Sequence, residues 1–236
     1  MSTANVAILA SGGGTTAEAF IRACAAGQVA AEVTLIICNN PDAGVFARVE
    51  QLNQELGLHI ATELISSKTH PAAEGEAVAQ GCQTAAEEAA VLEALQATKF
   101  DLVLLLGYMK RVGPSIIKAF GWQPEYSSPY QAQMLNTHPG LLPETIGHYG
   151  IHVQEYVLEK GLAYAGQTLH VVSEKYDEGP TVAEHKVPVE PGDTPESLFA
   201  RVQATEKQYL PIDVEAFLQA RTNYLQQNPN PTSSSA

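Results

Sequence analysis

The stretch "NVAILASGGGTT" (residues 5–16) joins an apolar run to a glycine-rich turn and the start of a helix. The run at 5–10 is typical of a buried parallel strand, and apolar periodicity predicts a helix from about Thr16 to Ala26. Glycines let the backbone approach a ligand closely, and a helix N-terminus offers N–H groups to an anion. The turn therefore suits a phosphate, although a tight turn that needs positive φ is an equally simple reading. It is neither a Walker loop nor a dinucleotide fingerprint.

Strands and helices alternate after this turn. Asp42 is placed to cap the second helix and Gly57 to stop it. The predicted strands are 31–39, 58–64 and 100–109, and the predicted helices are 42–57 and the Ala- and Glu-rich segment 71–97. This rhythm predicts an α/β fold, Rossmann-like, with a mostly parallel twisted sheet flanked by helices.

The pattern loosens after residue 110 and predicts an antiparallel C-terminal portion. Thr194 followed by Pro195 is typical of a helix start, and the stripe Leu198, Val202 and Tyr209 should face a core. The other predicted elements are a strand end at 133–139, a helix at 150–161, and strands at 165–173 and 180–189. We expect one domain over residues 1–220, with a polar, disordered tail at 221–236.

Composition limits the possible partners. The 236 residues carry 26 acidic and 13 basic side chains, for a formal charge of −13, which disfavours nucleic acid as a partner. Three cysteines without motif spacing predict reduced thiols and a cytoplasmic protein. We expect no metal site, because HExxH and CxxC are missing, and no signal peptide or membrane span. The oligomeric state is left open, with a homodimer as one option.

Two polar residues lie at the end of a predicted strand, in "LNTHPGLLPE" (135–144). Alternation along an extended chain points Asn136 and His138 to the same side. An amide can donate to a developing oxyanion, and an imidazole can shuttle a proton near neutral pH. Asp177, in the turn "EKYDEGP" (174–180), could raise the pKa of the imidazole and fix its tautomer. Each residue alone also fits a structural role, as a turn cap, a packed histidine or a solvated acid.

Six blocks of sequence carry a family resemblance between about residue 5 and residue 218. They are VAILASGGGTT (6–16), FDLVLLLGYMKRVGP (100–114), LNTHPGLLP (135–143), GIH (150–152), YDEGPTVAEHKVPV (176–189) and ARVQATEKQYLP (200–211). In this order they closely resemble the glycinamide ribonucleotide formyltransferase family, folate-dependent enzymes of purine synthesis. The collinear set carries the resemblance, and no single block does.

The resemblance implies a reaction and a site. The amine of glycinamide ribonucleotide would attack the formyl carbon of 10-formyltetrahydrofolate, without a metal or a covalent enzyme intermediate. Asn136 and His138 would stabilise the oxyanion, and Asp177 would support the imidazole and a water that relays the proton. The further matches are Gly13, Gly14, Thr15 and Thr16 for the phosphate; Met109, Lys110, Arg111 and Val112 for the folate; and Gln203 and Glu206 for the glycinamide substrate.

The chain also departs from this family. Thr15-Thr16 stands where Ser-Asn is common, and Lys110-Arg111 where Arg is followed by an aliphatic residue. Segments 71–97 and 121–133 are longer than usual. The alternatives are a formyltransferase acting on an amino-sugar nucleotide or on methionyl-tRNA, a formyltetrahydrofolate hydrolase, and a non-catalytic folate- or nucleotide-binding protein. The intact set Asn136, His138 and Asp177 argues against the last.

Overall fold

The computed structural model of the chain describes residues 3–229. The chain divides into two compact units, Met1–Gly121 and Trp122–Ala236, and each is described by itself. Within the described residues, no helix has both the length and the apolar character needed to cross a bilayer.

The first unit is built on a parallel sheet of four strands. Its strands are β1 (Ala4–Ala10), β2 (Ala31–Cys38), β3 (Ala61–Leu64) and β4 (Leu102–Leu105). β1 pairs with β2 on one side and β4 on the other, and β3 extends the sheet beyond β2. Because β1 has a neighbour on both sides, Ile8 and Leu9 are completely buried, as the continuous apolar run at 5–10 predicts.

Four helices accompany this sheet: α1 (Thr15–Ala25), α2 (Val45–Leu56), α3 (Ala85–Ala97) and α4 (Pro114–Phe120). Gly57 ends α2 with a φ of 66°, as predicted. The predicted cap at Asp42 is wrong, since the N-cap of α2 is Gly44 and the N–H of Asp42 donates to Asn40 Oδ1 instead.

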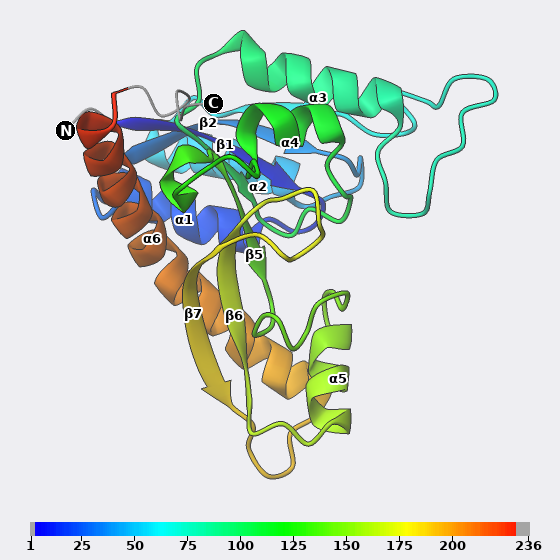
Figure 1. Cartoon of the computed structure of the whole chain (residues 1–236), viewed down its shortest axis with the longest axis vertical. Helices are drawn as coiled ribbons and strands as arrows, with labels where there is room; N and C mark the ends of the chain where they lie inside the picture. The colour runs from blue at the N-terminus through cyan, green and yellow to red at the C-terminus, as the bar shows by residue number, and fades with distance from the viewer. Residues whose placement is uncertain (1–2, 230–236) are drawn as a thin grey trace. The chain divides into compact units, whose positions relative to one another are not determined.

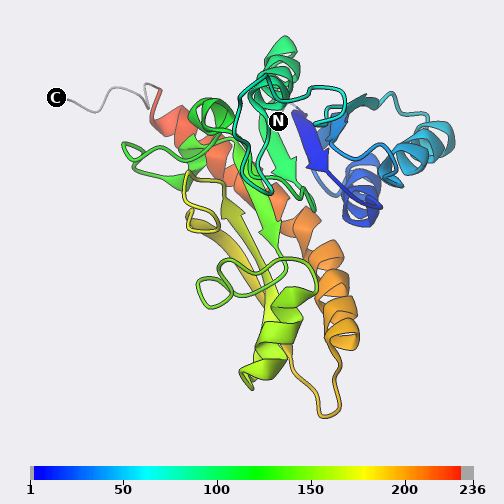
Figure 2. The same cartoon turned by 90° about the vertical axis from the view of Figure 1, so that its right-hand side faces the viewer.

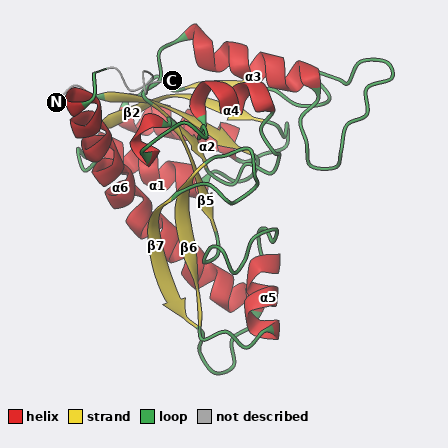
Figure 3. Ribbon diagram, in the orientation of Figure 1, coloured by secondary structure: helices red, strands yellow, loops and turns green. Residues whose placement is uncertain are grey.

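The prediction of a helix over 71–97 is correct only from residue 85 onward. Figure 3 shows a long loop leading into α3, and Gly75 and Gly81 within it have φ values of 81° and 76°. Left-handed glycines interrupt a helix, whereas Thr84 and Glu87 form a reciprocal capping box that starts one. The helix therefore begins where the N–H groups of Thr84, Ala85 and Glu87 find side-chain acceptors.

The second unit is an antiparallel sheet with two helices and a short 3₁₀ turn. The elements are η1 (Pro129–Gln131), β5 (Met134–His138), α5 (His152–Glu159), β6 (Tyr164–Val171), β7 (Thr181–Pro188) and α6 (Pro195–Gln227). β6 pairs with β5 and β7, and α6 lies along β6 and β7 (Figures 1 and 2). Leu198 and Val202 of α6 pack on Val187 and Ala165 of the sheet, so these two residues of the predicted stripe are buried.

The observed strands confirm the predicted fold class, a mostly parallel sheet with an antiparallel C-terminal portion. Thr194 caps α6 through a reciprocal capping box with Ser197, as its position before Pro195 predicts. The helix continues to Gln227, past the boundary predicted at residue 220, so residues 221–227 are helical rather than disordered. The remainder of the predicted tail, from residue 230, lies outside the described residues, and the single domain over 1–220 stays a prediction.

Candidate active site

Asn136 and His138 lie on one face of β5, as their spacing predicts. β6 runs antiparallel beside them, and its register places His170 opposite Asn136 and Thr168 opposite His138. Directly opposed residues on one face are within contact distance of each other. The end of β5 therefore gathers an amide and two imidazoles, and the second imidazole was not among the predicted residues.

The protonation of His170 follows from its partners. Its Nδ1 lies 3.1 Å from the carbonyl oxygen of Val171, which can only accept, so Nδ1 carries the proton. Nε2 is then an acceptor, and Asn136 Nδ2 donates to it at 3.0 Å. This bond fixes the orientation of the amide and uses one of its two N–H groups. The assignment of an oxyanion to the second N–H of Asn136 stays a prediction.

Asp177 joins this cluster from the turn between β6 and β7. Its Oδ2 lies 3.4 Å from His138 Nδ1 and its Oδ1 lies 3.6 Å from His170 Nε2, so the predicted grouping of Asn136, His138 and Asp177 is present in space. Asp177 has a φ of 58°, in the left-handed region that costs energy for residues other than glycine. A Cβ on Gly179 would lie 1.7 Å from the carbonyl oxygen of Val171, so only glycine lets the turn fold back onto β6.

Burial dominates the electrostatics of the two imidazoles. The side chains of His138, His170 and Asp177 are each at most 3% exposed. Desolvation lowers the pKa of His138 to about 4, with His170 and His148 acting in the same direction. Desolvation also lowers the pKa of His170 to about 4. The rise in pKa expected from a neighbouring carboxylate is outweighed, and both imidazoles are neutral at pH 7.

The predicted phosphate loop is an exposed turn at the N-terminus of α1. Gly14 is the N-cap of this helix, with a φ of 71° and no side-chain cap, and Thr15 and Thr16 are its first two residues. A Cβ at Gly14 would lie 2.6 Å from Val45 Cγ2, so this glycine is needed for both its conformation and its packing. Nothing lies within 4 Å of a Cβ at Gly13, whose outer side is open.

A guanidinium lies beside this loop, which the sequence pattern did not reveal. Arg48 of α2 donates from Nε to the carbonyl oxygen of Gly13 at 2.7 Å, and its Nη1 pairs with Glu18 of α1. Arg22 also pairs with Glu18, at 2.9 Å, and is the main cause of the lowered pKa of that carboxylate. Arg22 pairs in turn with Glu55 at 2.7 Å, so two guanidinium groups and two carboxylates form one network at this end of α1, and the binding of a phosphate there stays a prediction.

The predicted folate segment, Met109–Val112, is held by its alternate backbone N–H groups. The N–H of Met109 donates to Ser11 Oγ at 2.8 Å, and that of Arg111 donates to the carbonyl of Gly81, also at 2.8 Å. The N–H of Gly113 donates to Gln83 Oε1 at 2.8 Å. The long loop before α3 is therefore part of the support of this segment rather than a separate surface feature.

The side chains of the predicted folate segment have different surroundings. Met109 is 54% exposed, whereas Val112 is 8% exposed and packs inward. Lys110 Nζ lies 2.5 and 2.6 Å from the two carboxylate oxygens of Glu87, whose side chain is 1% exposed. The ammonium group of Lys110 is therefore engaged within the protein, and this side chain is the least suited of the four to bind a ligand.

Gln203 and Glu206 lie three residues apart on α6. Gln203 is half-buried and Glu206 is buried, on the side of the helix that carries Val202. Sequence reasoning without the family would treat both as solvated polar residues, and the burial of Glu206 shows that this is wrong for one of them. Their assignment to the glycinamide substrate stays a prediction.

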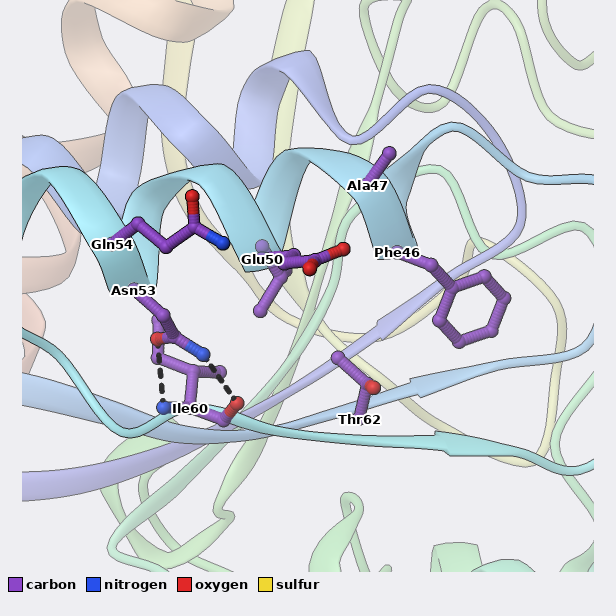
Figure 4. A pocket seen from close by; sticks show the side chains of 8 residues that line it. Phe46, Ala47, Glu50, Asn53, Gln54, Ile60 and Thr62 are labelled. Carbon is purple, nitrogen blue, oxygen red and sulfur yellow. Dashed lines mark hydrogen bonds between the residues drawn. The ribbon is translucent and has the colours of Figure 1, made fainter.

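A separate groove between α2 and β3 does not contain the candidate residues. It measures about 500 Å³ and is lined by Phe46, Glu50 and Thr62, among others (Figure 4). Asn53, on its wall, bonds both backbone groups of Ile60 at 2.9 and 3.0 Å, so that amide serves the fold. Among residues 3–229, no group of three or more His, Cys, Asp or Glu side chains is arranged to hold a metal ion.

The chain is similar to known proteins over most of its length. A family model described as formyl transferase matches residues 4–214. The phosphoribosylglycinamide formyltransferase of Escherichia coli K12 is 28% identical over 217 residues, which cover 92% of this chain and 88% of that protein. The crystal structure of phosphoribosylglycinamide formyltransferase from Bacillus halodurans is 34% identical, with a TM-score of 0.72 over 91% of this chain and 95% of the other. Glycinamide ribonucleotide transformylase 1 from Symbiobacterium toebii is 31% identical, with a TM-score of 0.74 over 92% and 89%.

Proposed function

Because the chain belongs to the formyl transferase family, we propose that it transfers a formyl group from 10-formyltetrahydrofolate to the amine of glycinamide ribonucleotide, a step of de novo purine synthesis. The observation that carries this proposal is the buried cluster at the end of β5. There Asn136 is oriented by His170, and His138 lies 3.4 Å from Asp177. A module that only binds a ligand has no need of two neutral imidazoles and a carboxylate in one buried cluster.

The chemistry assigned to the cluster is an acyl transfer. The lone pair of the amine attacks the formyl carbon and forms the new C–N bond, while the formyl oxygen becomes an oxyanion. Asn136 donates its second N–H to this oxyanion, which stabilises it more than the ground-state carbonyl. His138 takes the proton that the amine loses, with Asp177 stabilising the charge that develops on the ring. The oxyanion then collapses to a carbonyl, the bond from carbon to N10 of the folate breaks, and that nitrogen takes up the proton that His138 received.

We assign the ribonucleotide phosphate to the loop Gly13–Thr16. The N–H groups at the start of α1, together with the positive end of its dipole, suit an anion, and Gly13 leaves the approach open. Arg48 holds the carbonyl of Gly13 in place and neutralises Glu18 in the first turn of α1. The contacts rest on backbone N–H groups, so the replacement of the family's usual Ser-Asn by Thr15-Thr16 is compatible with them.

We assign the folate to the backbone of Met109–Val112. The N–H groups of residues 109, 111 and 113 are used inside the protein, so the intervening N–H groups of Lys110 and Val112 are those we assign to the donor. Exposed Met109 and Arg111 would contact it with their side chains. Gln203 and Glu206 would bind the glycinamide portion. A cytoplasmic location and the homodimer option remain predictions from the sequence.

The test is steady-state kinetics of Asn136→Ala with both substrates. We expect kcat to fall by roughly 10²- to 10³-fold with little change in either KM, because the amide acts on the transition state. Asn223→Ala, an exposed position on α6, is the matched control and should leave both constants unchanged.

The wild-type protein must also discriminate between the alternatives. Transfer to glycinamide ribonucleotide, but not to an amino-sugar nucleotide or methionyl-tRNA, supports the proposal. Consumption of the folate without an amine acceptor would indicate a hydrolase. Ligand binding without turnover of any acceptor would indicate a binding protein, and either result would overturn the proposal.

A further inference from the structure

Thr145 lies directly on the imidazole of His138, and no role has been assigned to it. Its Oγ1 is 2.9 Å from His138 Nε2, and the residue is 1% exposed. It comes from the loop between β5 and α5, seven residues after the histidine. The two nitrogens of His138 therefore face different partners, Thr145 at Nε2 and Asp177 at Nδ1.

The hydroxyl group has a single proton, and its second partner decides where that proton lies. Thr145 Oγ1 donates to the carbonyl oxygen of Leu141 at 2.9 Å, and a carbonyl oxygen can only accept. The oxygen of Thr145 must then accept from His138, which places a proton on Nε2. The resulting chain runs from Nε2–H through the hydroxyl to the Leu141 carbonyl, and each of its bonds has a normal length.

The proton on Nε2 determines the state of the other nitrogen. Since burial keeps His138 neutral at pH 7, Nδ1 carries a lone pair. The 3.4 Å separation from Asp177 Oδ2 is longer than the 2.9 Å at Nε2, as expected when the proton lies on the Thr145 side. His170 has its proton on Nδ1, bonded to Val171, so the neighbouring imidazole does not compete for the same site.

The loop that carries Thr145 is held in place by the sheet and by α5. Thr168 Oγ1 of β6 donates to the carbonyl of Gly140 at 2.8 Å, and Gln154 Nε2 of α5 donates to that of Pro139 at 2.7 Å. A Cβ on Gly140 would lie 2.3 Å from Thr145 Oγ1, so glycine is required for the hydroxyl to reach its position. The contact is therefore a product of the fold rather than of a freely moving side chain.

We propose that Thr145 is a positioning residue of formyl transfer, which fixes the Nε2–H tautomer of His138 so that Nδ1, beside Asp177, is the nitrogen that takes up the proton of the amine. This reverses the tautomer that a carboxylate alone would select. When Nδ1 receives the proton, Asp177 stabilises the imidazolium on one side and the hydroxyl relay stabilises it on the other. The inference rests on the proposed function, since it gives a purpose to His138 in that reaction.

The test compares Thr145→Val, which keeps the shape but removes the relay, with Thr145→Ser, which keeps the hydroxyl. The first measurement is the ¹⁵N chemical shifts of His138 in the free protein at pH 7, which distinguish the two tautomers without any substrate. We expect Nε2–H in the wild type and in Thr145→Ser, and a shift toward Nδ1–H in Thr145→Val. The other charged or titratable groups that face the ring, Asp177, His170 and His148, are the same in all three proteins.

The second measurement is the pH profile of kcat. Thr145→Val should lose about 10- to 100-fold in kcat and shift the profile, with both KM values little changed, and Thr145→Ser should stay within about 3-fold of the wild type. A wild-type His138 protonated on Nδ1 overturns the proposal, as does a Thr145→Val protein with unaltered tautomer and profile. If the tautomer changes as expected but the wild type transfers no formyl group, the proposed function fails while the positioning by Thr145 stands. If Thr145→Val does not fold, the tautomer of His138 in the wild type and in Thr145→Ser still tests the proposal.

Discussion

Replacing Lys110 by methionine should destabilise the protein more than it weakens folate binding. The ammonium group of Lys110 lies 2.5 and 2.6 Å from both oxygens of the Glu87 carboxylate, which is almost completely buried. Removing one partner of a buried ion pair costs about 3–5 kcal/mol, because the remaining charge is left uncompensated. Lys110 is 17% exposed and the N–H of Thr84 also donates to Glu87 at 2.8 Å, so we expect the lower end, about 3 kcal/mol.

The measurement is urea denaturation followed by circular dichroism, together with KM for the formyl donor. The double variant Lys110→Met, Glu87→Gln should lose at least about 1 kcal/mol less of the free energy of unfolding than the two single variants lose together. Lys118→Met, an exposed position on α4, is the control for losing one cation.

The opposite result would refute this reasoning. If Lys110→Met keeps wild-type stability at every pH while KM for the donor rises tenfold or more, the ammonium serves the ligand and the Glu87 pair is incidental. The original assignment of the Lys110 side chain to the folate would then be correct. If both stability and KM change, Lys110→Arg separates the two effects, because arginine keeps the charge next to Glu87 but alters the shape of the segment.

Two further predictions concern the imidazoles and the phosphate loop. Between pH 7.5 and pH 5, the free energy of unfolding should fall by about 2 kcal/mol for each of His138 and His170, because each has a pKa near 4 when folded and near 6.5 when unfolded. In urea denaturation, His170→Gln should remove about half of this pH dependence. A pH dependence that the variant leaves unchanged contradicts the burial argument. Gly13→Ala should raise KM for the ribonucleotide without loss of stability, whereas Gly14→Ala should raise it and also destabilise the protein, since its new Cβ would meet Val45. Unchanged ribonucleotide KM in Gly13→Ala would remove the phosphate from this loop.

The elements that the sequence predicts correctly are those with a local cause. The buried strand at 5–10, the stop at Gly57 and the start at Thr194 each depend on a few neighbouring residues, and each is present in the structure. Asp42 is not the cap of α2, because it lies in a turn where its N–H donates to Asn40 Oδ1 and the helix begins only after Gly44. The helix expected from residue 71 begins later, because two glycines in the left-handed conformation precede it. In both cases a turn residue competes with the helix pattern over a distance too short for periodicity to resolve.

The part of the site that could not be predicted is the support around the expected residues. Alternation alone placed Asn136 and His138 on one face of a strand, but the partner of each comes from elsewhere, His170 from β6 and Thr145 from the following loop. Antiparallel register decides which residue of β6 faces Asn136, and register depends on how the whole strand pairs rather than on any local signal.

The same limit applies to the charges, and it changes how the site should be tested. From the sequence alone, Lys110 is predicted to contact the ligand, because it lies in a ligand-binding segment. In the structure its ammonium group pairs instead with the buried carboxylate of Glu87, twenty-three residues earlier in the chain. From the sequence alone, the pKa of His138 is expected to be raised by the neighbouring acid. Burial lowers this pKa instead. Variants chosen from the sequence alone would therefore combine loss of folding with loss of function. A pair of variants in which one keeps the buried contact and the other removes it, such as Thr145→Ser and Thr145→Val, separates loss of folding from loss of function.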